Sequence, residues 1–200
     1  MKRETILAYY REELSRYSRI AFKRGLVGGT GGNLSLRVPD TDTVLITPTG
    51  ISLAEIEPAM NVLVDLEGNI LESPLEYKGS KETGFHLSAY KIRQDVLAIA
   101  HLHPPYATAY SCTGKPLPLA TVSARVILKS VPCIPCFNPG SKELAESVTS
   151  ALKAEPGIKA LLMQDHGILA LGADMNAAFH TADLVEHTAQ VAYILKGIQG

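Results

Sequence analysis

The clearest signal in this chain of 200 residues is the segment Val96-Leu97-Ala98-Ile99-Ala100-His101-Leu102-His103. Its first five residues are apolar, as in a buried strand. Side chains alternate between faces along a strand, so His101 and His103 point to the same side, one pleat apart. The segment therefore predicts a strand whose end presents two imidazoles to one point, an arrangement that suits a transition metal.

A third imidazole follows a second apolar run. Ala160-Leu161-Leu162-Met163 leads through Gln164-Asp165 to His166 and Gly167. Two strand ends can therefore bring three neutral nitrogen ligands together, and a catalytic zinc site typically has three protein ligands and one open position. The ordinary alternative is that each histidine is hydrogen-bonded at the surface or in the core. An HxH pair alone does not establish a metal site.

Composition indicates a globular protein with a sizeable core. The chain is 46% hydrophobic and 20% charged, with a formal net charge of -1, values that fit one domain, expected over residues 1–200. No run of lysine and arginine indicates a nucleic-acid surface. No apolar segment approaches the ~20 residues of a membrane span, and the charged N-terminal segment does not resemble a signal peptide. We therefore expect a cytoplasmic protein that binds neither nucleic acid nor membrane.

Hydrophobic periodicity and turn residues predict four substantial helices and about eight short strands. The helices are expected at 3–24, 82–93, 142–153 and 174–195, with a short helix at 106–111 and with Ser80 and Ser141 as caps of the second and third. The strands are expected at 34–38, 44–47, 62–65, 70–71, 96–103, 159–164 and 167–171, and the proline-rich residues 116–139 are expected to form short extended pieces. The many hairpin-like neighbours predict an α/β protein with a central, mostly antiparallel sheet flanked by helices.

Several other residues are weaker candidates for chemistry. Cys133 and Cys136 have CxxC spacing. The chain has no second CxxC motif, and no helix directly follows this one, so a packing role is favoured over a redox or metal-binding pair. Cys112 is the third cysteine, and three cysteines do not form a disulfide framework. His180 and His187 lie on the last predicted helix and are expected to be exposed or packing residues.

Two glycine-containing turns precede or follow strands. Gly28-Gly29-Thr30-Gly31-Gly32-Asn33 precedes a strand, whereas a dinucleotide fingerprint opens a helix, so a Rossmann site is rejected. Thr47-Pro48-Thr49-Gly50 is a similar turn at another strand end. Their backbone N–H groups and hydroxyls predict either an anion-binding nest or tight turns without a ligand.

Glu82 lies at the predicted start of the helix over 82–93. A glutamate in a first helical turn is explained by the helix dipole, and the functional alternative is a general acid/base beside the metal. His86 is four residues further along the same helix face. Its neighbours Phe85 and Leu87 belong to a packed side, which favours a structural histidine.

The order of the motifs resembles the class II aldolase/adducin family. The motifs are Gly-Thr-Gly-Gly-Asn (29–33), Thr-Pro-Thr-Gly (47–50), Ser-Lys-Glu (80–82) with Phe-His (85–86), His-x-His (101–103) and Asp-His-Gly (165–167). Each is weak alone, but five in this order, over about residues 5–195, are specific. The resemblance implies a three-layer α/β/α fold and a homotetramer with its sites near subunit interfaces.

The resemblance also implies the roles of individual residues. One zinc ion per chain would be held by His101, His103 and His166, and Glu82 would be the catalytic acid/base that can also occupy the open metal position. Manganese, cobalt or iron would also suit an imidazole site. The positions implied to bind a substrate phosphate are Thr30, Gly32, Asn33, Thr49, Gly50 and Ser80, and Lys81 beside them could bind phosphate or a substrate carboxylate.

The implied activity is cleavage of a small phosphorylated ketose to dihydroxyacetone phosphate and an aldehyde. A zinc ion would stabilise the enediolate, and Glu82 would protonate its carbon. Lys81 stands where aldolases often have a second serine. Some family members that look like sugar-acid phosphate decarboxylases carry a lysine before the glutamate. Decarboxylation is therefore an alternative reaction, as are epimerisation and dehydration. Val122 or a neighbour stands where the aldolases have a tyrosine that handles the aldehyde half of the substrate. The identity of the sugar is therefore left open. The three imidazoles and the carboxylate argue against a non-catalytic, adducin-like interaction domain.

Overall fold

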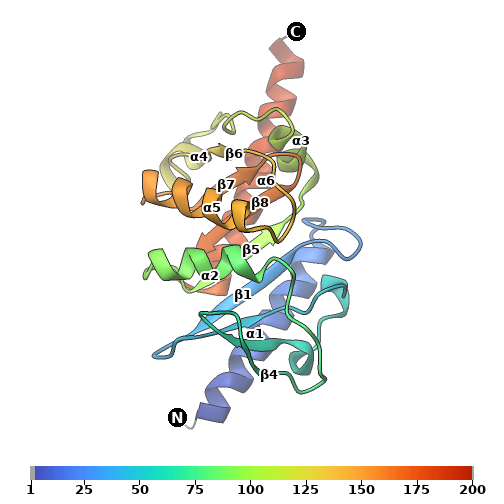
Figure 1. Cartoon of the computed structure of the whole chain (residues 1–200). Coiled ribbons are helices and arrows are strands. Elements are labelled where there is room, and N and C mark those ends of the chain that lie inside the picture. Colours follow the sequence, from blue (N-terminus) through green and yellow to red (C-terminus); the bar gives the residue numbers. More distant parts are fainter. Residues whose placement is uncertain (1–2, 200) are drawn as a thin grey trace.

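One eight-stranded sheet organises the chain in a computed structural model that describes residues 3–199 (Figure 1). The strand order is β4-β3-β2-β1-β5-β8-β7-β6. The strands are β1 Asn33–Val38, β2 Thr43–Ile46, β3 Val62–Asp65, β4 Ile70–Glu72, β5 Ala98–Leu102, β6 Cys133–Ile134, β7 Ala160–Met163 and β8 Gly167–Gly172. Neighbouring strands are antiparallel except β6 and β7, which are parallel. The prediction of an α/β protein with a mostly antiparallel sheet is confirmed, and the sheet is mixed.

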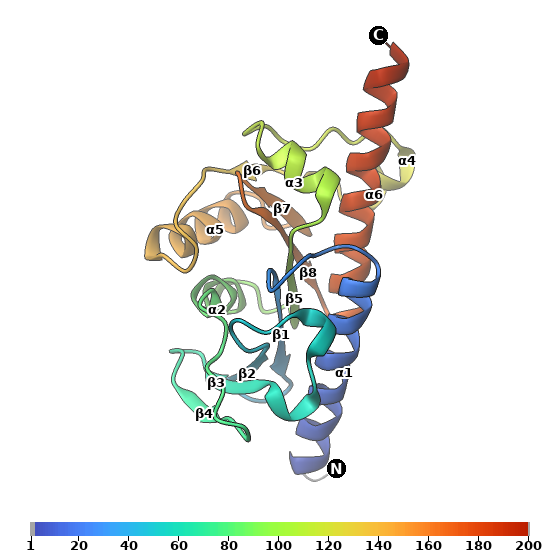
Figure 2. The same ribbon diagram turned by 90° about the vertical axis from the view of Figure 1, so that its right-hand side faces the viewer.

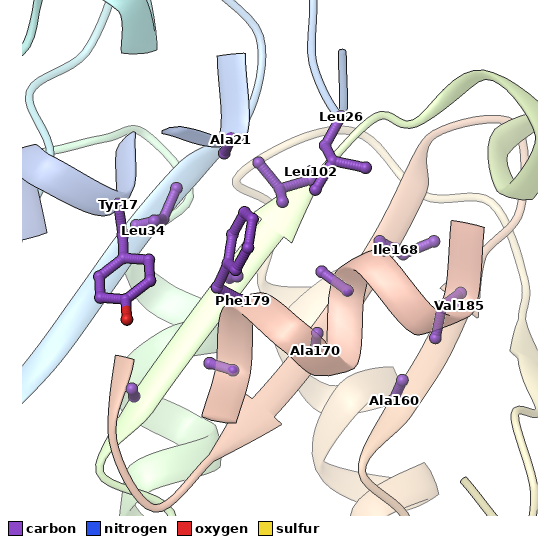
Figure 3. Packing of buried hydrophobic residues seen from close by; sticks show 14 of the residues in the cluster. Tyr17, Ala21, Leu26, Leu34, Leu102, Ala160, Ile168, Ala170, Phe179 and Val185 are labelled. Carbon is purple, nitrogen blue, oxygen red and sulfur yellow. The ribbon is translucent and has the colours of Figure 1, made fainter. Parts of the chain in front are cut away.

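Helices cover both faces of this sheet (Figure 2). The helices are α1 Arg3–Lys23, α2 Thr83–Ile92, α3 Pro105–Ser111, α4 Val122–Ile127, α5 Lys142–Ala154 and α6 Met175–Gln199, with two 3-10 turns, η1 Leu53–Glu55 and η2 Pro58–Met60. One face packs against α1, α3, α4 and α6, and Figure 3 shows Tyr17, Leu102 and Phe179 in that layer. The other face packs against α2 and α5. Among residues 3–199, no helix has both the length and the apolar character that crossing a membrane requires.

Strand β5 contributes to both cores because its side chains alternate. Ala98, Ala100 and Leu102 belong to the cluster beneath α1 and α6, whereas Ile99 belongs to the cluster beneath α2 and α5. His101 has the parity of Ile99, and its ring meets the edge of Phe85 from α2 at a centroid distance of 5.3 Å. The alternation predicted from the sequence therefore directs His101 to the α2 side of the sheet.

Helix α1 ends where the sequence predicts. Gly25 has a φ of +75°, the left-handed conformation that glycine adopts at little cost. Its N–H donates to the carbonyl of Phe22, and the N–H of Leu26 donates to the carbonyl of Ala21. These two bonds form a Schellman cap, which turns the chain into the glycine-rich loop before β1.

Two local predictions are wrong. The proline-rich residues 116–139 contain the helix α4 as well as extended segments, and its start is capped by Thr121, whose hydroxyl accepts the N–H of Ala124 at 3.2 Å. Helix α2 begins at Thr83 with Glu82 as the preceding cap residue, so Ser80 is not its cap. Ser80 instead accepts the N–H of Glu82 on its hydroxyl, at 3.2 Å, which closes a turn before the helix. By contrast, Ser141 caps α5 as predicted.

Candidate active site

The three predicted histidine ligands lie together at one end of the sheet. His101 lies in β5, His103 follows the end of that strand, and His166 lies in the turn between β7 and β8. One ring nitrogen of each lies within 4.8 Å of the others, and Nε2 of His101 is 3.0 Å from Nε2 of His103. The antiparallel pairing of β5 with β8 brings these separate strand ends together, with Leu102 opposite Ile168.

The tautomer of His101 is set by the backbone. Its Nδ1 lies 2.9 Å from the carbonyl oxygen of Ile168, and a carbonyl can only accept, so Nδ1 carries the hydrogen. Nε2 then faces the histidine cluster: in the neutral ring it presents a lone pair to a cation, and only the ring protonated on both nitrogens donates from Nε2 to Glu82. A metal-ligating histidine is commonly oriented in this way by a backbone carbonyl.

Burial keeps the neighbouring rings uncharged. Desolvation, together with repulsion between its protonated form and those of His101 and His166, lowers the pKa of His103 to about 3. Desolvation and electrostatic repulsion from His101 also lower the pKa of His166. Both rings are therefore neutral near pH 7, and neutral imidazole is the form that binds metals.

Glu82 brings a carboxylate to the same place. Its Oε2 lies 3.1 Å from Nε2 of His101, and its Oε1 lies 3.3 Å from Nε2 of His166. Burial alone would raise the pKa of Glu82, but the hydrogen bonds and charges of His101, His166 and Asn33 outweigh burial and lower it to about 2. The carboxylate is therefore ionised at neutral pH.

These donors fit a divalent transition-metal ion. Three imidazole nitrogens face one another, and the buried Oε1 of Glu82 has no hydrogen-bond partner within residues 3–199. A cation beside these atoms would compensate the buried carboxylate, which is otherwise costly to bury. Three neutral histidines suit zinc in particular, with other borderline divalent ions as alternatives.

Two glycines make room for the His103 ring. A Cβ on Gly31 would lie 2.7 Å from Nδ1 of His103. A Cβ on Gly167 would lie 2.6 Å from Cδ2 of His103 and 2.5 Å from the backbone oxygen of Leu102. Neither glycine has a positive φ, so the missing side chain, rather than an unusual backbone, is what these positions require. Sequence reasoning missed this role, because it assigned the glycine-rich loop only to turns and anion binding.

The predicted phosphate-binding positions lie on three segments at the histidine end of the sheet. They are Thr30, Gly32 and Asn33 before β1, Thr49 and Gly50 after β2, and Ser80 and Lys81 before α2. The N–H of Thr49 donates to the carbonyl of Lys78, and the N–H of Ser80 donates to the carbonyl of Thr47. These bonds join the second and third segments. Asn33 is directly opposite His101 in the β1–β5 ladder, which places the first segment beside the histidines.

Asn33 differs from the other predicted phosphate positions. Its side chain is buried, with Nδ2 2.9 Å from Oε2 of Glu82 and Oδ1 2.6 Å from Nε2 of His86. The Asn33 amide therefore contacts the carboxylate directly, and its role in phosphate binding stays a prediction. Thr30, Gly50 and Lys81 are exposed by contrast, and Thr49 and Ser80 are partly exposed.

The remaining candidates lie outside the histidine cluster. His86 is completely buried and has both ring nitrogens hydrogen-bonded, to Asn33 and Ser35, in agreement with its prediction as a structural histidine. His180 and His187 are exposed. All three cysteines are free thiols, and only Cys133 packs against the core. The packing role predicted for the CxxC pair is therefore wrong for Cys136, which is exposed, as Cys112 is.

Comparisons with known proteins agree with the order of the motifs. Residues 12–193 match the model of the family described as Class II Aldolase and Adducin N-terminal domain. An L-fuculose phosphate aldolase of Methanococcus maripaludis is 33% identical over 187 residues, covering 94% of this chain and 98% of that protein. A 3-oxo-tetronate 4-phosphate decarboxylase of Haemophilus influenzae is 34% identical over 192 residues, covering 94% of this chain and 88% of that protein. A solved structure of an L-fuculose 1-phosphate aldolase superposes with a TM-score of 0.88 at 34% identity, covering 96% of this chain and 88% of that chain.

Proposed function

The chain belongs to the class II aldolase and adducin family, and we propose that it is a zinc-dependent lyase that cleaves a small phosphorylated ketose to dihydroxyacetone phosphate and an aldehyde. The contact between Glu82 and two of the three converging imidazoles carries this proposal. An ionised carboxylate beside a set of neutral metal ligands is what proton transfer at the carbon next to a carbonyl requires. The L-fuculose phosphate aldolases among the relatives support the same reaction class.

Glu82 performs the proton transfer in this proposal. Because its pKa is low, it starts the condensation direction as a base and removes a proton from the carbon next to the carbonyl. In the cleavage direction the substrate hydroxyl that becomes the aldehyde loses a proton, and Glu82 takes up this proton and delivers it to the carbon next to the carbonyl. A divalent cation held by His101, His103 and His166 would supply Lewis-acid stabilisation of the negative charge on the substrate oxygens.

The phosphate group would be held by the loops around the histidine end of the sheet. The hydroxyls of Thr30, Thr49 and Ser80, the backbone at Gly32 and Gly50, and the charge of Lys81 are suited to an anion. Asn33, which the resemblance also implies, is the seventh position, and its side chain contacts Glu82 and His86 as well. Fixing the phosphate would align the reacting carbon with Glu82.

A second candidate function is decarboxylation of a sugar-acid phosphate. Lys81 immediately precedes Glu82 and offers a positive charge to a substrate carboxylate. The decarboxylase of Haemophilus influenzae is as similar to this chain as the aldolase relatives are. Epimerisation and dehydration would use the same proton transfer and are further alternatives.

Product analysis separates these functions. Zinc-loaded protein is incubated with a panel of ketose 1-phosphates and 3-oxo-sugar-acid phosphates, and released dihydroxyacetone phosphate and carbon dioxide are measured in parallel. The proposal predicts dihydroxyacetone phosphate from at least one ketose phosphate, and none when Glu82 is replaced by Gln. Release of carbon dioxide alone would assign the decarboxylase function.

We also propose that the chain forms a homotetramer as one domain, with its sites near subunit interfaces. Apolar side chains gather on α4 and on the end of α6, where Val122, Val126, Tyr193 and Ile198 are 62–76% exposed. The end of α6 projects beyond the rest of the molecule (Figure 1). Exposed apolar patches of this kind mark interaction sites, which supports contact with other copies. The cytoplasmic location expected from the sequence stays a prediction.

A further inference from the structure

A row of buried polar side chains leads from Glu82 into the space between the sheet and α2. Oε2 of Glu82 lies 2.9 Å from Nδ2 of Asn33, and Oδ1 of Asn33 lies 2.6 Å from Nε2 of His86. Nδ1 of His86 lies 2.7 Å from Oγ of Ser35. Asn33 and Ser35 belong to β1, and His86 belongs to α2. The proposed reaction assigns no task to His86 or Ser35.

With Glu82 ionised, one set of directions satisfies every hydrogen bond in this row. An ionised carboxylate only accepts, so Asn33 presents an Nδ2–H to it. Oδ1 of Asn33 then faces His86 and only accepts, which requires the hydrogen of the His86 ring to be on Nε2. Nδ1 of His86 is then an acceptor, and the Ser35 hydroxyl donates to it.

No interior member of the row carries a charge near pH 7. His86 is completely buried, and desolvation, with the charge of His101, lowers its pKa to about 3. The hydroxyl of Tyr90, 2.7 Å from Oγ of Ser35, can donate to the Ser35 carbonyl at 3.0 Å. Burial raises the pKa of Tyr90, so this phenol keeps its proton. The row is therefore a fixed set of dipoles that ends on Glu82.

We propose that His86 is a positioning residue: Ser35 holds it in the Nε2–H tautomer, and it thereby fixes the Asn33 amide with Nδ2 toward Glu82. The reversed amide would set Oδ1 of Asn33 against Oε2 of Glu82, two acceptors at hydrogen-bond distance. With Oε2 held, Oε1 is the oxygen left to exchange a proton with the substrate. This inference deepens the proposed function, because it concerns the group that acts there as acid and base.

The tautomer of His86 is measured directly by long-range 1H–15N NMR of histidine-labelled, zinc-loaded protein. The His86 signals are assigned by their loss in His86→Gln. The expected spectrum at pH 7 has a protonated Nε2 and an unprotonated Nδ1. In Ser35→Ala, where Nδ1 loses its donor, we expect the ring to shift toward the Nδ1–H form. A wild-type ring protonated at Nδ1, or at both nitrogens, would overturn the proposal.

Kinetics of the same variants test the effect on Glu82. Ser35→Ala should lower kcat about 10- to 100-fold, the usual effect of losing a residue behind the reacting groups, with KM and bound zinc nearly unchanged. Ser35→Thr keeps the hydroxyl and should restore kcat. Tyr90→Phe is the matched control, because it removes the next buried hydroxyl but leaves Ser35 able to donate to His86.

These outcomes distinguish a positioning role of His86 from a general packing effect. They also distinguish failure of this proposal from failure of the lyase proposal. Equal losses of kcat in Ser35→Ala and Tyr90→Phe would indicate general loss of packing and overturn the proposal, as would an unchanged kcat in Ser35→Ala. Failure of the lyase assignment would appear separately, as wild-type protein that releases no product. The NMR measurement decides the tautomer in that case too.

Discussion

Oε2 of Glu82 lies 3.1 Å from Nε2 of His101, although Glu82 precedes α2 and His101 lies in β5. The proposed acid/base therefore contacts a proposed metal ligand directly. Burial of both side chains strengthens this electrostatic coupling relative to an exposed pair. Substitutions that separate metal binding from proton transfer are consequently the most informative.

Glu82→Gln should keep the metal and lose turnover. Gln retains the size of the side chain but cannot act as a base at neutral pH. We expect bound zinc to stay near one ion per chain and kcat to fall about 10²- to 10⁴-fold, the usual contribution of a general acid/base. Metal analysis and steady-state kinetics on one preparation measure both, with Glu146→Gln on the surface as control. Full activity in Glu82→Gln would remove its assigned role.

Gly31→Ala and Gly167→Ala should weaken metal binding. In Gly31→Ala the added Cβ lies 2.7 Å from the His103 ring. In Gly167→Ala it lies 2.6 Å from that ring and 2.5 Å from the backbone oxygen of Leu102, so the ring and, at Gly167, the end of β5 must move. We expect zinc affinity to fall about 10- to 100-fold, as when a group that orients a ligand is changed. Competition with a chelating dye measures the affinity. Gly28→Ala is the control, because a Cβ there meets nothing within 4 Å, and an equal loss in that variant would contradict the role of the ring.

The stability of metal-free protein should fall as the pH decreases from about 6.5. The pKa of His86 is about 3 in the folded chain and near 6.5 when exposed, so between these values the unfolded chain binds one more proton there. The free energy of unfolding therefore decreases with decreasing pH, by about 1.4 kcal/mol per pH unit from this residue.

Denaturant titrations of wild-type protein and His86→Gln between pH 7 and pH 5 test this dependence. In His86→Gln the free energy of unfolding should change less with pH than in wild type, even if the variant is less stable at every pH. His180→Gln, at an exposed site, should keep the pH dependence of wild type. Equal slopes in wild type and His86→Gln would show that His86 is not buried in its neutral form.

A charge on the α4 surface should disrupt the proposed tetramer. Val126 is 67% exposed in the single chain, and Val126→Glu would place a carboxylate in an apolar interface, where an unpaired charge is costly. Light scattering should give four chain masses for wild type and fewer for the variant. Leu71→Glu, at the other edge of the sheet, is the matched control. A monomeric wild-type protein would contradict the tetramer.

Local patterns were sufficient to predict most of the fold. Alternation along β5 placed His101 and His103 on one side of the sheet, and Gly25 marked the end of α1. Helix α4 was missed because prolines surround it and its large apolar residues, Val122, Val126 and Ile127, are exposed. Only Ala124 of this helix is buried, so the helix has no broad inward-facing apolar stripe.

Relationships between distant segments were not predictable in the same way. The contact of Gly31 with His103 joins a loop to the end of a strand, and no spacing rule connects them. The row from Asn33 to His86 joins residues 53 positions apart. The resemblance implied a phosphate contact for Asn33, and the contact of its side chain with Glu82 was not visible in the sequence.

Binding of one metal ion by His101, His103 and His166 is tested most directly by metal analysis of wild-type protein and His101→Ala, each purified with zinc present and dialysed. Wild type should retain about one zinc ion per chain, whereas His101→Ala should retain almost none and the surface variant His187→Ala should match wild type. A wild-type protein without metal, or a His101→Ala protein that retains it, would contradict the site.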